Sequence, residues 1–201
     1  MSALQELVTR IASCPNCDLC KTRTRAVPGE GPENAEIMLV GEGPGYHEDQ
    51  QGRPFVGAAG RLLEELLGSV GLKRTDVYIT NVVKCRPPQN RDPLPVEIDA
   101  CRTYLERQIE LIRPLLIITL GRYSLAWFFP RDTISRVHGH IRERDGIHFL
   151  HMYHPAAALH GGLRAVIEQE FRKIPEALSK ARQTAAPAPP EPAVEQMRLF
   201  K

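Results

Sequence analysis

The stretch that decides the fold of this chain is residues 36–45, which read EIMLVGEGPG. Its first half is a short apolar run of the kind that forms a buried strand, and the run stops at Gly41. Its second half is a glycine-rich loop with glycines at positions 41, 43 and 45. Ligands gather at the carboxyl ends of parallel strands, so we expect this loop to lie at a binding site.

The sequence on both sides of this stretch repeats the alternation of strands and helices. Apolar runs predict further strands at 77–80 and 115–120, and Asp145-Gly146 predicts a tight turn between extended segments at 139–144 and 147–153. Helical spacing predicts helices over residues 2–12, 58–70, 96–112, 122–128 and 163–182. This order predicts a three-layer α/β/α domain with a mainly parallel central sheet.

Length and composition indicate how many domains the chain forms and that it folds. The chain has 201 residues, of which 42% are hydrophobic and 25% charged, so it can bury a core and is not disordered throughout. From residue 183 the sequence becomes rich in Ala and Pro. We expect a single domain over residues 1–182 and a flexible tail over 183–201.

The charge and the apolar runs bear on partners and compartment. The net charge is only +2, so binding to nucleic acid would depend on local clusters of basic residues. No apolar run approaches the ~20 residues of a membrane-spanning helix. The first residues also lack a basic segment followed by an apolar one, the pattern of a signal peptide. We therefore expect a cytoplasmic protein with no membrane contact.

Five cysteines need an explanation other than disulfides, which are rare in a reducing compartment. Cys14, Cys17 and Cys20 fall within seven residues, and Cys85 and Cys101 follow much later. Four thiolates from such a set suit a structural zinc ion or a [4Fe–4S] cluster, and the spacing does not choose between them. The plainer interpretation is a group of buried free cysteines.

Two polar motifs fall at the carboxyl ends of the expected strands. The glycine-rich loop carries Glu42 and Glu48 but lacks the Lys-Ser/Thr of a phosphate-binding loop, so a carboxylate that orients a water is the better interpretation. Phe55 follows, either as core or as a platform on which a planar ring stacks. His154 stands before a proline, which favours an extended backbone, and it shares this edge with Asn81. A purely structural histidine is the alternative.

These motifs together resemble the family 4 uracil-DNA glycosylases, which are iron–sulfur enzymes. The matching elements are Cys14-x-x-Cys17, GEGPG at 41–45, Glu48-Asp49, GRPFVG at 52–57, TNVVKCRPP at 80–88, Cys101 and HPAA at 154–157. The resemblance implies a four-stranded sheet and a [4Fe–4S] cluster on Cys14, Cys17, Cys85 and Cys101. Cys20 falls outside this pattern.

The resemblance also implies the roles of the site residues. Phe55 would stack on a uracil flipped out of DNA, Asn81 would read its edge, and His154 would donate a hydrogen bond to its O2 atom. Glu48, or else Glu42, would position the attacking water. The remaining implied contacts come from the backbone of Gly41, Gly43 and Gly45. The implied activity is that of a monofunctional glycosylase that leaves an abasic site.

Thymine differs from uracil by a methyl group, which Tyr46 or Gly45 would have to exclude. One alternative function is that of a non-catalytic iron–sulfur protein that binds uracil-containing DNA. Related proteins that become covalently trapped on DNA carry a histidine in a basic loop, whereas residues 85–93 contain none, so we expect turnover. An electron carrier built on Cys14, Cys17 and Cys20 is the remaining alternative.

Contacts to partners are expected from four places. Lys84 and Arg86, beside Cys85, are predicted to bind DNA, as is the basic segment 21–25. Leu159 is either a wedge that fills the gap left by the flipped base or a core leucine. The chain ends in a peptide that resembles the sliding-clamp-binding motif of bacteria, with Gln196, Leu199 and Phe200 as its contacts. We expect a monomer.

Overall fold

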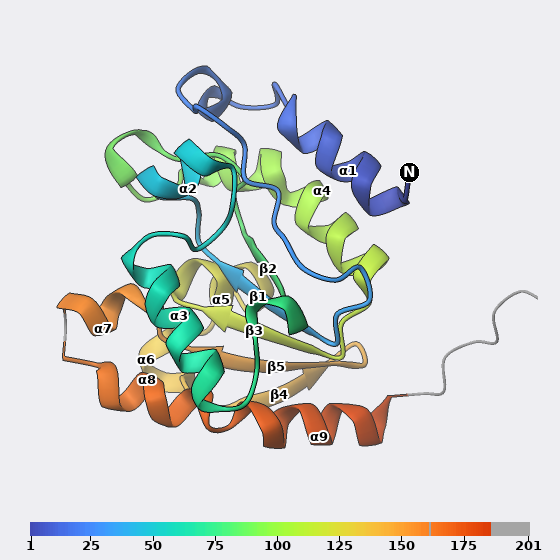
Figure 1. The fold of residues 1–201 in the computed structure, drawn as a ribbon, viewed down its shortest axis with the longest axis vertical. Coiled ribbons are helices and arrows are strands. Elements are labelled where there is room, and N and C mark those ends of the chain that lie inside the picture. The colour runs from blue at the N-terminus through green and yellow to red at the C-terminus, as the bar shows by residue number, and fades with distance from the viewer. Residues whose placement is uncertain (161, 186–201) are drawn as a thin grey trace, which may run out of the picture.

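A computed structural model describes residues 1–160 and 162–185 of the chain. The predicted clamp-binding residues Gln196, Leu199 and Phe200 lie outside the described residues, as does the expected tail beyond residue 185. The strands are β1 (Ile37–Gly41), β2 (Tyr78–Asn81), β3 (Leu116–Leu120), β4 (Ile141–Arg144) and β5 (Ile147–Met152). Figure 1 shows them as one central sheet.

The sheet has the order β2-β1-β3-β5-β4. The pairs β1–β2, β1–β3 and β3–β5 are parallel, and β4 joins β5 as an antiparallel edge strand. The predicted mainly parallel α/β class is confirmed, but the described sheet has five strands where four were expected. The fifth arises because the first half of the predicted Asp145-Gly146 hairpin extends the sheet.

Helices cover both faces of the sheet. They are α1 (Ala3–Ala12), α2 (Tyr46–Gln51), α3 (Ala58–Ser69), α4 (Pro95–Ile112), α5 (Arg122–Phe128), α6 (Ile134–Val137), α7 (Ala156–His160), α8 (Arg164–Phe171) and α9 (Ile174–Thr184). Short 3₁₀ turns are η1 (Asp18–Lys21), η2 (Arg74–Asp76) and η3 (Pro88–Asn90). The helix expected over 163–182 is divided into α8 and α9, because Pro175 has no backbone N–H and its ring opposes continuation from the preceding turn.

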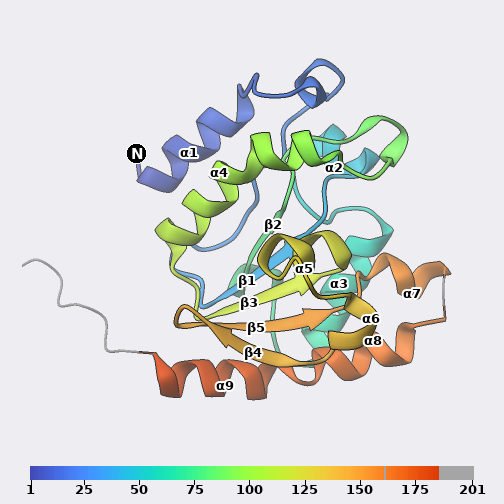
Figure 2. The ribbon, with the colours of Figure 1, turned by 180° about the vertical axis from the view of Figure 1, so that it is seen from behind.

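The alternation of side chains along each strand builds a core on each face of the sheet. Met38 and Val40 of β1 face a cluster formed with α1, α4 and α5, whereas Ile37 and Leu39 face a cluster formed with α3, α8 and α9. The view from behind shows the same three layers (Figure 2). The expected α/β/α arrangement is therefore present in the described residues.

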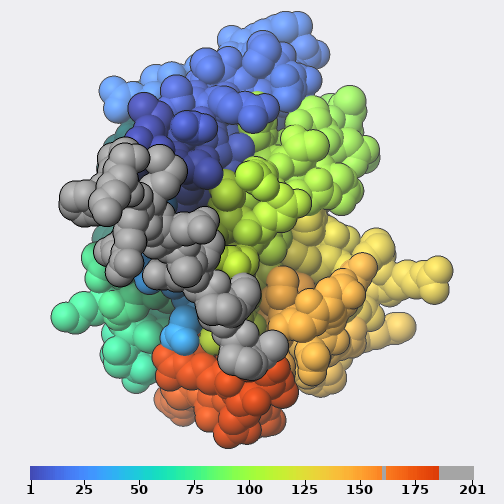
Figure 3. Space-filling model, turned by 90° about the vertical axis from the view of Figure 1, so that its right-hand side faces the viewer, coloured from blue at the N-terminus to red at the C-terminus, as the bar shows by residue number. Residues whose placement is uncertain are grey.

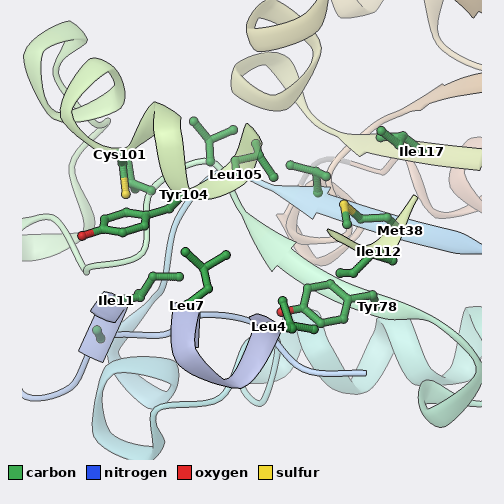
Figure 4. Packing of buried hydrophobic residues seen from close by; sticks show 14 of the residues in the cluster. Leu4, Leu7, Ile11, Met38, Tyr78, Cys101, Tyr104, Leu105, Ile112 and Ile117 are labelled. Atoms are coloured by element: carbon green, nitrogen blue, oxygen red, sulfur yellow. The ribbon is translucent and has the colours of Figure 1, made fainter. Parts of the chain in front are cut away.

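The N-terminal segment belongs to the α4 side of the molecule. Leu7 and Ile11 of α1 point toward Tyr104 and Leu105 of α4, and Cys101 lies one turn along the same helix (Figure 4). The space-filling view shows the N-terminal segment beside α4, with α9 at the opposite end of this face (Figure 3). Among the described residues, no helix is both long enough and apolar enough to span a membrane.

Candidate base-binding pocket and cysteine centre

A cavity of about 270 Å³ opens at the carboxyl ends of β1 and β2. It forms there because parallel pairing brings Gly41 and Asn81 opposite one another at the ends of their strands. Most of the residues predicted to form the site line this cavity: Glu42, Gly43, Gly45, Glu48, Phe55, Asn81 and His154. Asn90 and Arg91, from the loop that leads into α4, complete its mouth.

Asn81 is the polar residue at the floor of the pocket. Its side chain is only 2% exposed, and its Oδ1 atom is buried with no hydrogen-bond partner among the described residues. An unpartnered buried acceptor is costly, and such atoms are usually satisfied by protein, water or a ligand. A Cβ atom at Gly41 would overlap Oδ1 and the Phe55 ring, so the glycine gives both side chains the space they occupy.

Phe55 forms one wall of the pocket in an unusual backbone conformation. It is 5% exposed and has φ +51°, which is uncommon for a bulky residue. Arg74 donates from Nη1 to the Phe55 carbonyl at 2.9 Å and from Nη2 to the Pro54 carbonyl, which stabilises this turn. The Phe55 carbonyl also lies against Gly60 of α3, where a Cβ atom would overlap it. The aromatic ring is thus held by a rigid support.

His154 stacks on Phe55 from the end of β5, with ring centroids 5.5 Å apart and planes inclined by 26°. Its Nδ1 atom accepts a hydrogen bond from the backbone N–H of Ala156 at 3.1 Å. In the neutral ring the proton must then lie on Nε2, which leaves that atom as a donor. Desolvation lowers the pKa of His154 to about 4, against the opposing effect of Glu48. The ring is therefore a neutral donor at pH 7.

Glu48 holds the loop together through its carboxylate. Oε1 accepts hydrogen bonds from the backbone N–H groups of Val56 and Gly57, both at 2.8 Å, and Oε2 accepts one from Gly45 at 3.1 Å. These bonds tie the start of α2 to the segment that carries Phe55. A carboxylate accepts at about four positions, so one remains for a water.

Glu42 lines the same pocket from the loop after β1. Desolvation raises the pKa of its carboxyl group, with a further contribution from Asp92 and an opposing one from Arg122. Unlike that of Glu48, its side chain makes no hydrogen bond within the described part of the chain. The structure brings both carboxylates predicted from the sequence to one cavity but gives them different surroundings.

The five cysteines line a second, separate pocket between α1, η1, the segment after β2 and α4. The four cysteines of the predicted ligand set therefore come together, although Cys20 joins them. Cys85 and Cys101 are buried, while the other three are partly exposed. Burial raises the pKa of the Cys101 thiol to about 11 and also raises that of Cys85.

The donor set fits a thiolate-bound centre. Cys85 Sγ accepts a hydrogen bond from Arg23 Nη1 at 3.0 Å, and Cys101 Sγ accepts one from the backbone N–H of Lys84 at 3.2 Å. Such N–H donors are typical of iron–sulfur sites, where they tune the potential. Within residues 1–160 and 162–185, no three His, Cys, Asp or Glu side chains converge closely enough for one metal ion. The choice between a zinc ion and a [4Fe–4S] cluster therefore stays a prediction.

The predicted DNA contacts have different outcomes. Lys84 is 1% exposed, so the prediction that it contacts DNA is wrong: its amine is enclosed by protein acceptors. Arg86 remains accessible, 5.2 Å above the ring of Tyr46, and Tyr46 is 54% exposed. Leu159 is 41% exposed, which excludes the core alternative and leaves the wedge as a prediction. Lys21 is paired with Asp18 at 2.6 Å.

Three residues have roles at these sites that the sequence motifs did not predict. Gln108 reaches the end of β2 through tertiary contacts, and no motif marks it. Arg23 donates to Cys85 at the cysteine centre, whereas the sequence predicted only a DNA contact for its segment, residues 21–25. Glu97, which is 3% exposed, accepts bonds from Arg91 and so fixes the loop at the pocket mouth. Glu97 stands three residues after Leu94 and accepts a hydrogen bond from the Leu94 N–H. This spacing is that of a helix-capping residue, which the sequence could have indicated.

Comparison with known proteins agrees with this geometry. The model of the uracil DNA glycosylase superfamily matches residues 28–179, and the chain therefore belongs to that superfamily. It is 50% identical over 194 residues to a type-4 uracil-DNA glycosylase of Archaeoglobus fulgidus, covering 92% of this chain and 98% of the relative. It is 43% identical over 184 residues to the type-4 uracil-DNA glycosylase of Thermotoga maritima, covering 88% and 96%.

A type-4 uracil-DNA glycosylase of Sulfurisphaera tokodaii is 49% identical over 188 residues, covering 88% of this chain and 85% of the relative. A type-5 uracil-DNA glycosylase of Thermus thermophilus is more distant, at 36% identity over 151 residues, covering 65% and 68%. The resemblance seen in the sequence motifs is confirmed, and with it the expectation of an enzyme of the glycosylase class.

Proposed function

We propose that the protein flips uracil out of DNA and hydrolyses its N-glycosidic bond, leaving an abasic site for base excision repair. The observation that carries the proposal is the unpartnered Oδ1 atom of Asn81, buried beside the Phe55 ring at the end of β2. A planar base stacked on Phe55 would bring a donor to this acceptor. The three type-4 relatives described above are named uracil-DNA glycosylases, which supports the same interpretation.

The amide of Asn81 matches one edge of uracil. Oδ1 would accept from the uracil N3–H, and the amide nitrogen would donate to O4. Cytosine presents the opposite pattern, so buried groups would stay unpaired at a cost of about 1–3 kcal/mol each. Thymine shares the edge of uracil and must be excluded by its methyl group. Of the two residues considered for this, Gly45 lines the pocket.

Cleavage leaves negative charge on uracil O2 and positive charge on the sugar. His154, neutral and with its proton on Nε2, would donate to O2 and stabilise the departing base. A carboxylate would stabilise the sugar and orient the water. Glu42 is our choice for this task because its acceptor sites are open, while Glu48 holds the loop and keeps one site for a water.

Two features support a monofunctional, releasing enzyme. Strand cleavage by a glycosylase needs an amine at the sugar, and no lysine is among the described residues that line the pocket. Covalent trapping needs a nucleophile in the loop after Cys85, and residues 86–93 contain no histidine. Uracil release without strand cleavage is therefore the outcome we expect.

The cofactor we propose is a [4Fe–4S] cluster held by Cys14, Cys17, Cys85 and Cys101, which line one pocket. When bound, it would supply a four-point crosslink between the N-terminal segment, the chain after β2 and α4. Cys20 lies close enough to compete as a ligand. Iron and sulfide analysis, together with the visible absorption of the purified protein, separates this cluster from zinc.

We also propose that the C-terminal peptide docks on a sliding clamp. The support is its sequence: a glutamine, an apolar residue and a Leu-Phe pair close the chain after a Pro/Ala-rich stretch. Deletion of residues 194–201 should abolish binding to a clamp and leave uracil excision unchanged. Unchanged clamp affinity would overturn this part of the proposal.

The test of the main activity is direct. The protein is incubated with uracil-containing DNA, and abasic sites are then cleaved with alkali. Asn81→Ala should lower the excision rate by about 10²–10³-fold, the usual cost of losing one group that binds the transition state. A protein with its visible absorption intact that forms no abasic site would defeat the proposal in favour of a binding protein.

A further inference from the structure

Lys84 is a buried lysine that lines the cysteine pocket but does not line the base-binding pocket. Its side chain is 1% exposed, and its Nζ atom donates to Thr80 Oγ1, to the Asn81 carbonyl and to Gln108 Oε1, each at 2.7 Å. A buried amine is expensive unless every donor finds an acceptor. Three acceptors match the three donors of an ammonium group. The site around Lys84 is therefore built for this side chain.

One of the three acceptors belongs to the residue that would read the base. Asn81 is the last residue of β2, and its side chain reaches over Gly41 to the pocket. Lys84 holds the carbonyl of that same residue three positions back along the chain. A shift of the Asn81 backbone would carry its amide away from the base edge, so the lysine controls where the amide lies.

The other acceptors anchor the amine to rigid parts of the fold. Gln108 on α4 is fully buried and donates to the Pro28 carbonyl at 2.8 Å and to Tyr78 Oη at 3.1 Å. Thr80 donates to the same Pro28 carbonyl at 2.8 Å. The amine thus ties the end of β2 to α4 and to the segment that precedes β1.

The main chain of Lys84 reaches the cysteine centre. Its N–H donates to Cys101 Sγ at 3.2 Å, and Cys85 is the next residue. Cys101 lies on α4, the helix that also carries Gln108. The residue is therefore bonded at one end to the cysteine centre and at the other to the residue at the floor of the pocket.

We propose that Lys84 is a positioning residue that sets the place of Asn81 for base recognition and links the cysteine centre to the pocket. This inference rests on the proposed uracil excision. Because Lys84 does not reach the surface, its loss should slow the chemical step without weakening the grip on DNA. A DNA-contacting lysine would behave in the opposite way, lowering affinity and the steepness of its salt dependence.

The experiment compares Lys84→Met with the wild-type protein and with Lys173→Met. Lys173 also donates to a backbone carbonyl, that of Gly139 at 2.8 Å, but on the far side of the sheet from α4. Single-turnover excision, DNA affinity at several salt concentrations and thermal unfolding are measured. We expect Lys84→Met to excise about 10- to 100-fold more slowly, since displacement by about 1 Å can cost that much. DNA affinity and its salt slope should stay unchanged, and Lys173→Met should excise normally.

A second variant separates positioning from stability. Lys84→Met with Gln108→Leu no longer leaves Gln108 Oε1 unpaired, but it also removes the bonds from Gln108 to the Pro28 carbonyl and Tyr78 Oη, so it changes stability without restoring the bond to the Asn81 carbonyl. We expect this double variant to excise as slowly as Lys84→Met, whichever way its melting temperature moves. Recovery of the rate together with the stability would overturn the proposal, as would a weaker and less salt-dependent grip on DNA. An inactive wild-type protein would overturn the proposed function itself, whereas an active wild type with an equally active Lys84→Met would overturn this inference alone.

Discussion

The base pocket and the cysteine centre are built in opposite ways. The pocket forms where parallel strands end, and its key groups are held by backbone hydrogen bonds: Ala156 to His154, and Val56 and Gly57 to Glu48. The cysteine centre instead gathers side chains from three separate parts of the chain. Its buried thiols repel one another once ionised. The pocket is a product of the fold, whereas the proposed cluster would be what holds the sulfurs of the centre as thiolates.

The two regions also differ in what each leaves unsatisfied. In the pocket the unpartnered atom is one acceptor, Asn81 Oδ1, placed for a ligand that comes and goes. At the centre it is a set of soft donors suited to a resident group. Lys84 lies between them, with bonds to both. Perturbing one region at a time therefore shows whether they act separately.

The largest effect should come from breaking the cysteine centre. Cys101→Ser removes a buried sulfur from α4, and we expect it to abolish the visible absorption of an iron–sulfur cluster. Loss of such a centre belongs to the exceptional class of more than ~4 kcal/mol, or roughly 8–16 °C in melting temperature for a domain of this size. Absorption spectra and thermal melts of the purified proteins check both.

Cys20→Ser is the matched control for that prediction. Cys20 lines the same pocket but is not among the four proposed ligands, so its loss should leave the absorption in place. If Cys20→Ser bleaches the protein and one of the other serine variants does not, the proposed ligand set is wrong.

A second comparison lies within the pocket, between its two carboxylates. Glu42→Gln should lower the excision rate by about 10²-fold, as for the loss of a catalytic base, and leave the melting temperature unchanged. Glu48→Gln should lower both, because the new amide group would face backbone N–H donors that now meet an oxygen. Unfolding should become easier by about 1–3 kcal/mol. Rates and melts measured on the same samples separate the two roles.

An unchanged rate in Glu42→Gln would transfer the water-orienting role to Glu48. The sequence alone favoured Glu48 for this role, through its place in the motif. The structure gives the reason for preferring Glu42, since the bonds that occupy Glu48 come from residues eight and nine positions along the chain.

Local patterns in the sequence predicted much of the fold. The strands at 37–41, 78–81 and 116–120 are apolar runs flanked by turn residues, and burial in a parallel sheet needs little more. Helix α2 was missed because its sequence, YHEDQQ, has no apolar periodicity. It forms because Glu48 caps its first turn and Gly52 ends it with φ +72°.

The sequence motifs predicted several residues of the pocket but not the long-range contacts around them. Asn81 and His154 meet in one pocket because parallel strands end at the same edge, and Phe55 joins them from the loop between α2 and α3. Lys84 shows the limit: a lysine two positions before Arg86 is expected, from the sequence, at the surface. Its burial depends on Gln108, a residue 24 positions away on α4. No local pattern encodes that contact, and the same holds for Arg23 and Cys85.

Arg23 offers a smaller perturbation of the cysteine centre. It donates to Cys85 Sγ at 3.0 Å and to the Ala12 carbonyl at 3.0 Å. Arg23→Gln should shift the reduction potential of the proposed cluster to a more negative value, because hydrogen bonds and positive charge near the sulfurs favour the reduced form. Loss of visible absorption in the presence of a chelator should be about 10-fold faster.

Arg25→Gln is the control for Arg23, since Arg25 is exposed and two residues further along. It should leave potential and chelator resistance unchanged. An unchanged reduction potential in Arg23→Gln would mean that the guanidinium does not influence the cluster.

The smallest expected change in excision rate comes from a residue at the rim of the base pocket. It compares duplex DNA with single-stranded DNA as substrates. Leu159 on α7 is an apolar side chain 41% exposed, close in sequence to the pocket residues His154 and Ala156. A wedge is useful only where a base must leave a stack, at a cost of a few kcal/mol in a duplex and less in a single strand. Leu159→Ala should therefore slow excision from duplex DNA by about 3- to 10-fold, equivalent to ~0.7–1.4 kcal/mol of lost apolar contact. Excision from single-stranded DNA should be unaffected, and the cysteine centre should keep its absorption. Equal slowing on both substrates would instead assign Leu159 to the shape of the pocket, because only a wedge distinguishes a stacked base from a free one.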